Sequence, residues 1–130
     1  MPKLGPASMQ ALSEVHPLLQ RVVMVVAETF NLKVLCGHRG QAEQHKKFIE
    51  GFTQVDWPHG KHNSLPSLAV DIVPYPVDWE DRARFVYLAG HIRQEAIRQG
   101  IEIRWGGDWN KNTELFDNKF DDLPHFEIVI

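Results

Sequence analysis

The chain has 130 residues, of which 43% are hydrophobic and 24% are charged, so it has room for one domain with one core. Its formal charge of -3 and its interspersed basic and acidic residues exclude a basic surface for nucleic acid. The single cysteine, Cys36, excludes an intramolecular disulfide and a zinc site made of several thiolates. We therefore predict one domain over residues 1–130 and expect a monomer.

The first half of the chain alternates helices with short strands. Residues 8–30 predict a helix in two pieces, the second beginning at Pro17. Residues 33–36 predict a strand, and residues 41–51 predict a helix that Gly51 ends. A loop rich in Pro, Gly, Asn and Ser then leads to a strand at residues 68–73.

The second half contains the longest predicted helix, over residues 78–100, with one apolar face and Gly100 as its stop signal. Residues 101–105 predict a strand, residues 106–124 a polar and acidic loop, and residues 125–130 a closing strand. The strands are scattered between helices without a repeated βαβ pattern. This order predicts an α+β fold with a small, mostly antiparallel sheet flanked by helices. No segment approaches the roughly 20 apolar residues of a membrane span, so we expect no membrane insertion.

Asp71 is the unusual residue of the strand predicted at residues 68–73, because its neighbours are apolar. A buried carboxylate needs a cation, hydrogen-bond donors or a metal, since leaving it bare costs several kcal/mol. An arginine partner or a cap is one solution. A metal site is the other, because His62 lies nine residues earlier and His125 opens the last strand. Two histidines and one carboxylate are a ligand set typical of hydrolytic zinc.

Asp122 is placed to serve such a site as a general base. It lies three residues before His125. Pro124 between them restricts the backbone and biases Leu123 toward an extended conformation. The carboxylate could then reach over a metal without binding it.

Four sequence blocks resemble a known family. They are "CGHRGQAEQHKKFIEG", "GKHNSLPSLAVDIVPYP", "RWGGDW" and "DLPHFEI", and together they span about residues 15–130. They are similar to the signature blocks of the zinc D-Ala-D-Ala carboxypeptidase and L-alanyl-D-glutamate endopeptidase family, which includes VanY-type enzymes and short phage endolysins. The resemblance implies zinc ligands at His62, Asp71 and His125, a catalytic acid/base at Asp122, and a substrate or transition-state contact at Arg39, together with Gln44.

The chain departs from the family pattern in two places. Gly60 stands where the family has a serine, which removes a hydroxyl that would bond the substrate. The interval between His62 and Asp71 is two residues longer than the commonest pattern, a change that loops tolerate at little cost.

The resemblance implies a zinc-dependent peptidase, with one zinc per chain, that hydrolyses peptidoglycan stem peptides. A short chain without a signal peptide is typical of a phage endolysin, made in the cytoplasm and released to the wall after a holin opens the inner membrane. That favours an L-alanyl-D-glutamate endopeptidase. The alternative is a D,D- or L,D-carboxypeptidase that removes a terminal D-alanine, which Arg39 would serve equally well.

Two other classes use parts of the same pattern. One is a non-catalytic cell-wall-binding or tail-associated module, but such a module has no reason to keep Asp122 beside a metal. The other is a non-haem iron oxygenase, which uses the same ligand types but needs a tighter His-x-Asp pair and more strands.

Other polar residues have less definite predictions. Glu127 would either orient a metal ligand or lie at a solvated strand edge. We expect Asp108 to be structural, His59 to be a loop residue, and Cys36 to be buried without a catalytic part.

Overall fold

The computed structural model describes residues 4–115 and 121–130. These residues form four helices and four strands, in the chain order α1 (Pro6–Ser13), α2 (Pro17–Val26), β1 (Leu32–Cys36), α3 (Gln41–Ile49), β2 (Ala69–Pro74), α4 (Arg82–Gln99), β3 (Ile103–Gly106) and β4 (Asp122–Ile128). The strands make one antiparallel sheet in the order β1-β2-β4-β3. The predicted α+β class is confirmed.

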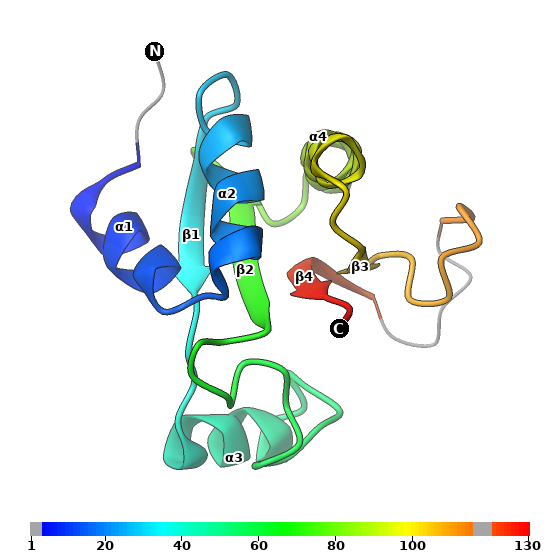
Figure 1. Cartoon of the computed structure of the whole chain (residues 1–130). Helices are drawn as coiled ribbons and strands as arrows, with labels where there is room; N and C mark the ends of the chain where they lie inside the picture. The colour runs from blue at the N-terminus through cyan, green and yellow to red at the C-terminus, as the bar shows by residue number, and fades with distance from the viewer. Residues whose placement is uncertain (1–3, 116–120) are drawn as a thin grey trace.

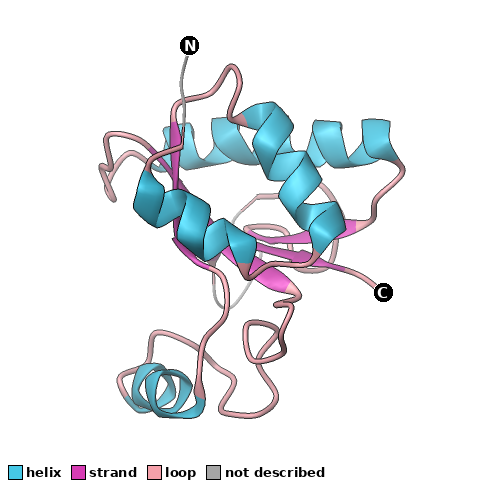
Figure 2. Cartoon of the chain, turned by 60° about the vertical axis from the view of Figure 1, so that its left-hand side comes forward, coloured by secondary structure: helices cyan, strands magenta, loops and turns pink. Residues whose placement is uncertain are grey.

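Three of the four helices belong to the same packed body as the sheet. Helix α4 lies against β2, β3 and β4, α2 packs on α4, and α1 lies against β1. The centre of this body is filled by fully buried side chains such as Val70, Ile72 and Phe126. Helix α3 stands apart from the other helices, with a short connection from β1 before it and the long loop that leads to β2 after it (Figures 1 and 2).

Helix α4 begins at Arg82, four residues later than predicted, because two aspartates shape the preceding turn. The Asp78 side chain accepts a hydrogen bond from the backbone N–H of Glu80. The side chain of Asp81 then caps the helix by accepting from the N–H of Arg84. The predicted end was right, since Gly100 adopts a left-handed φ of 74° that terminates the helix.

The limits predicted for the last strand were wrong at both ends. Strand β4 begins at Asp122, which pairs with Gly106 after an irregularity in the β3–β4 ladder. It ends at Ile128, and Ile130 is 82% exposed. Two burial predictions also need correction: Cys36 is half-buried, and Glu127 is buried, so it does not lie at a solvated edge.

Among the described residues, no helix combines the length and the apolar character that a membrane crossing requires.

Candidate metal centre and active site

The sheet places Asp71 and His125 opposite each other. They are direct partners in the antiparallel β2–β4 ladder, with Val70 opposite Phe126 as the next pair. Because Val70 and Phe126 are fully buried, core packing fixes the register that brings the two polar residues together. The loop before β2 then brings His62 to the same point, and its ring lies edge-on to His125 with 5.2 Å between centroids.

One oxygen of Asp71 is shared by both histidines. Asp71 Oδ1 lies 3.2 Å from His62 Nε2 and 3.4 Å from His125 Nδ1. Ligands held about 2.0–2.2 Å from a tetrahedral zinc ion are about 3.3–3.6 Å apart, so this spacing fits such an ion. Asp71 is thus spaced from each histidine as two ligands of one zinc ion would be, while the group whose ligand atoms all lie within 4.8 Å of one another is Cys36, His62 and Asp71.

The second ring nitrogen of each histidine is held by an acceptor. His62 Nδ1 lies 2.7 Å from the carbonyl oxygen of Gly37, and His125 Nε2 lies 2.8 Å from Glu127 Oε1. A histidine that donates from one nitrogen directs the other toward the metal with a fixed ring orientation. Both rings thus have the support that metal-binding histidines usually have, one from a neutral carbonyl and one from a buried carboxylate.

Burial and mutual charge shift the pKa values of His62, His125 and Asp71. Burial lowers the pKa of His62, but the charge of Asp71 and its hydrogen bond outweigh burial and raise that pKa to about 10. Burial likewise lowers the pKa of His125, and the hydrogen bonds to Asp71 and Glu127 raise it to about 9. Burial raises the pKa of Asp71, yet the two histidines hold it well below its usual range.

Asp122 differs from Asp71 in its ionisation. Its carboxylate Oδ2 lies 4.0 Å from His125 Nδ1, beside the three-residue donor set but outside it. Burial and the negative charge of Asp71 raise the pKa of Asp122 to about 6. A carboxylate with such a pKa can accept a proton and return it near neutral pH, as a general base must.

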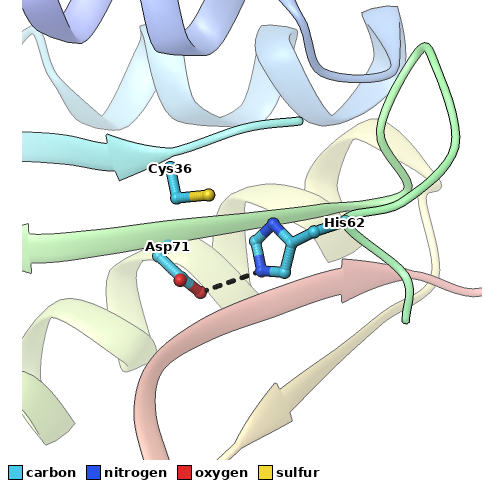
Figure 3. Close-up of side chains that lie close together, drawn as sticks. All are labelled: Cys36, His62 and Asp71. Carbon is cyan, nitrogen blue, oxygen red and sulfur yellow. Dashed lines mark hydrogen bonds and ion pairs between the residues drawn. The ribbon is translucent and has the colours of Figure 1, made fainter. Parts of the chain in front are cut away.

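Cys36 also lies at this centre, a position that was not predicted from the sequence. The ligand atoms of Cys36, His62 and Asp71 lie within 4.8 Å of one another, and Figure 3 shows His62 directed between the side chains from β1 and β2. Cys36 pairs with Asp71 where the β1–β2 register shifts. His62 and Asp71 therefore belong to two possible metal donor sets, one completed by His125 and the other by Cys36.

Arg39 and Gln44 also reach the centre. Arg39 Nη2 donates to Asp71 Oδ2 at 3.2 Å, and Arg39 Nη1 donates to Gln44 Oε1 at 3.1 Å. The side chain of Gln44 also accepts from Asn63 Nδ2 and donates to the carbonyl of Val55. With only 1% of its surface exposed, Gln44 is the centre of a buried polar network that fixes Arg39.

The same network accounts for Gly60. Its backbone N–H donates to Asn63 Oδ1 at 2.7 Å. A Cβ at Gly60 would lie 2.7 Å from Asn63 Oδ1 and 3.2 Å from Gln44 Cδ, too close for either contact to remain as it is. The absence of the family's serine at this position therefore follows from the packing of Asn63 and Gln44 beneath it.

Asp108 lies outside this centre. It is buried, accepts from Arg93 Nη1 at 3.0 Å, and also accepts from the backbone N–H groups of Asn112 and Thr113. It holds the turn after β3, which agrees with the structural part expected for it.

Two cavities flank the centre and share Arg39 and Asp122. The first, of about 660 Å³, extends past Cys36 and Asp71, and we call it the Trp79 cavity. The second, of about 570 Å³, extends past His62, His125 and Glu127, and we call it the Trp109 cavity. Each is large enough for a small ligand. The possible metal donors therefore lie at the junction of two open spaces.

Comparisons with known proteins agree on one family. The profile of the phage L-alanyl-D-glutamate peptidase family matches residues 1–129. The L-alanyl-D-glutamate peptidase of Escherichia phage T5 is 28% identical over 120 residues, which cover 88% of this chain and 87% of that protein. The crystal structure of the Serratia marcescens L-Ala D-Glu endopeptidase ChiX superposes with a TM-score of 0.76 and 28% identity, covering 98% of this chain and 90% of ChiX.

Proposed function

The chain belongs to the phage L-alanyl-D-glutamate peptidase family, and we propose that it is a zinc-dependent endopeptidase that cuts the L-alanyl-D-glutamate bond of peptidoglycan stem peptides. The observation that carries this choice is the pair of cavities meeting at Arg39 and Asp122. An endopeptidase must hold substrate on both sides of the bond, whereas a carboxypeptidase that releases one D-alanine needs little space on one side. The open space on both sides supports the endopeptidase.

We propose that His62, Asp71 and His125 hold one zinc ion. The shared oxygen of Asp71, the spacing of the donor atoms and the supporting hydrogen bonds to Gly37 and Glu127 all support this set. A zinc ion bound there would lower the pKa of a water and polarise the carbonyl of the bond to be cut.

Asp122 supplies the proton transfer in this proposal. Its carboxylate accepts a proton from the attacking water and passes that proton to the leaving amine. The raised pKa of about 6 suits both steps, because the group is a carboxylate at neutral pH and its conjugate acid is a usable donor.

Arg39 and Gln44 act as a pair. Arg39 lines both cavities, so its permanent charge lies beside the path of a substrate carboxylate or a developing oxyanion. Gln44 is almost fully buried and bonds Arg39 directly, so we propose that it positions Arg39 and does not itself contact the substrate.

Mass spectrometry of the products from purified peptidoglycan tests the bond. Cleavage at the proposed position gives fragments with a new amino-terminal D-glutamate, whereas free D-alanine would support the carboxypeptidase instead. A chelator should abolish turnover, and added zinc should restore it.

The variant Asp122→Asn tests the base. Because the amide cannot accept the proton, we expect turnover to fall by at least about 100-fold, the lower range for general-base catalysis, while the protein stays folded and binds zinc. Full activity in this variant would show that another group is the base.

A further inference from the structure

Trp79 presents a large aromatic ring to solvent at the wall of the Trp79 cavity. It lies in the connection between β2 and α4, and 59% of its surface is exposed. Its ring stacks on Phe85, with 5.5 Å between centroids and 24° between planes. Phe85 belongs to α4 and is buried in the core, so the exposed ring rests on a rigid support. A ring held in this way can receive another flat surface at little entropic cost.

A second exposed ring lines the same cavity. Phe52, just after α3, is 66% exposed, and the ammonium of Lys47 lies 5.6 Å from its ring centre. Arg82 and Asp121 line the cavity as an ion pair at 3.1 Å. Aromatic faces beside charged hydrogen-bonding groups suit a sugar, which offers a C–H face to a ring and hydroxyls to polar side chains.

In the proposed substrate, a sugar is attached close to the bond that is cut. The amino group of the L-alanine in a stem peptide is joined to the lactyl group of a muramic acid residue of the glycan. Cleavage after that L-alanine leaves one amino acid between the bond and the lactyl group, and one residue spans at most about 3.6 Å. A sugar held this close to the cleaved bond lies near Asp122, where the two cavities offer space for it.

The linings of the cavities decide between them. The Trp109 cavity is lined mostly by polar side chains, which include amides such as Gln54 and Asn110 as well as histidines and charged groups. Its tryptophan is half-buried and contacts His125, with 5.4 Å between ring centroids, so it is less available for stacking than the exposed Trp79. Such a lining suits a peptide backbone. We propose that the Trp79 cavity is a saccharide subsite that binds the muramyl end of the substrate, with Trp79 as its stacking platform. This inference rests on the proposed bond specificity.

Two substrates that differ only in the sugar test this subsite. One is a stem peptide carrying N-acetylmuramic acid on its L-alanine, and the other is the same peptide with a simple acetyl group there. In wild-type protein, kcat/KM should be higher for the sugar-bearing substrate. Trp79→Ala should lower the ratio of the two kcat/KM values about tenfold, and Trp79→Phe, which keeps a ring, should lower it less. An unchanged ratio in Trp79→Ala would overturn the proposal.

Tyr87→Ala is a matched control, because Tyr87 is also an exposed aromatic residue but lines neither cavity. It should leave the ratio as in wild type. Direct binding of N-acetylmuramyl-L-alanine, followed by calorimetry, separates the subsite from the reaction. Weaker binding to Trp79→Ala than to wild type supports the subsite whichever bond is cut. Equal binding to both overturns it.

Discussion

Two regions meet at the candidate metal centre, and different forces hold them in place. Strands β2 and β4, which we call the sheet region, position Asp71 and His125 through the fully buried side chains around them. Residues 37–67, which we call the loop region, carry Arg39 and His62 and include α3, which stands away from the packed body (Figure 2). Apolar burial therefore fixes one half of the site, and hydrogen bonds fix the other.

The loop region has little apolar packing of its own. Its helix exposes Phe48 and Ile49, and its buried side chains include the polar Gln44 and Asn63. A buried polar network contributes less to stability than apolar packing does, but it specifies the positions of its members. Substitutions of the apolar residues in the sheet region should therefore mainly affect folding, and those in the loop region should mainly affect the site.

The largest expected effect is a loss of folding stability on substitution in the sheet region. Phe126→Ala removes a fully buried ring from the residue next to His125, so we expect a loss of about 3–5 kcal/mol in the free energy of unfolding. Urea denaturation measures this loss. The control Ile130→Ala, at an exposed position beyond β4, should change stability by less than about 0.5 kcal/mol. Similar values for the two variants would contradict the assigned core.

The next largest effect is expected on zinc affinity when Glu127 is substituted. Its carboxylate holds His125 Nε2 at 2.8 Å, with Arg104 Nη1 3.4 Å from its second oxygen. Glu127→Ala should weaken zinc binding by about 10–100-fold, because the ring loses its orienting partner. Glu127→Gln can still accept the hydrogen bond and should recover part of the affinity. Competition with a chromophoric chelator measures both, and an unchanged affinity in Glu127→Ala would refute this positioning role.

A smaller effect on stability is expected at Gly60. Gly60→Ser should push Asn63 aside and break its bond to the Gly60 N–H, costing about 1 kcal/mol in the free energy of unfolding. Because Asn63 shares Gln44 with Arg39, catalytic activity should fall by more than this loss of stability explains.

Gly90→Ala is the matched control for Gly60→Ser, since a Cβ at this exposed position of α4 meets nothing within 4 Å. It should stabilise the protein by about 0.5–1 kcal/mol and leave activity unchanged. If Gly60→Ser behaved like Gly90→Ala in both measurements, the loop network would have no part in forming the site.

The sequence predicted more of the sheet region than of the loop region. Alternating apolar residues predicted β2 and placed Asp71 within it, and the resemblance predicted the family, which is confirmed. The network around Gln44 could not be predicted, because it joins α3 to loops whose paths depend on tertiary contacts. The approach of Cys36 depends on an irregular register between β1 and β2, which no local pattern encodes.

We propose that His125, and not Cys36, completes the metal site with His62 and Asp71. Zinc titration of the variants Cys36→Ser and His125→Ala, which gives the affinity and the number of ions bound per chain, distinguishes the two ligand sets. We predict that Cys36→Ser binds one zinc per chain with wild-type affinity, and that His125→Ala binds at least about 100-fold more weakly, because it has lost one of three ligands. Wild-type zinc binding by His125→Ala together with its loss in Cys36→Ser would show that Cys36, and not His125, is the third ligand.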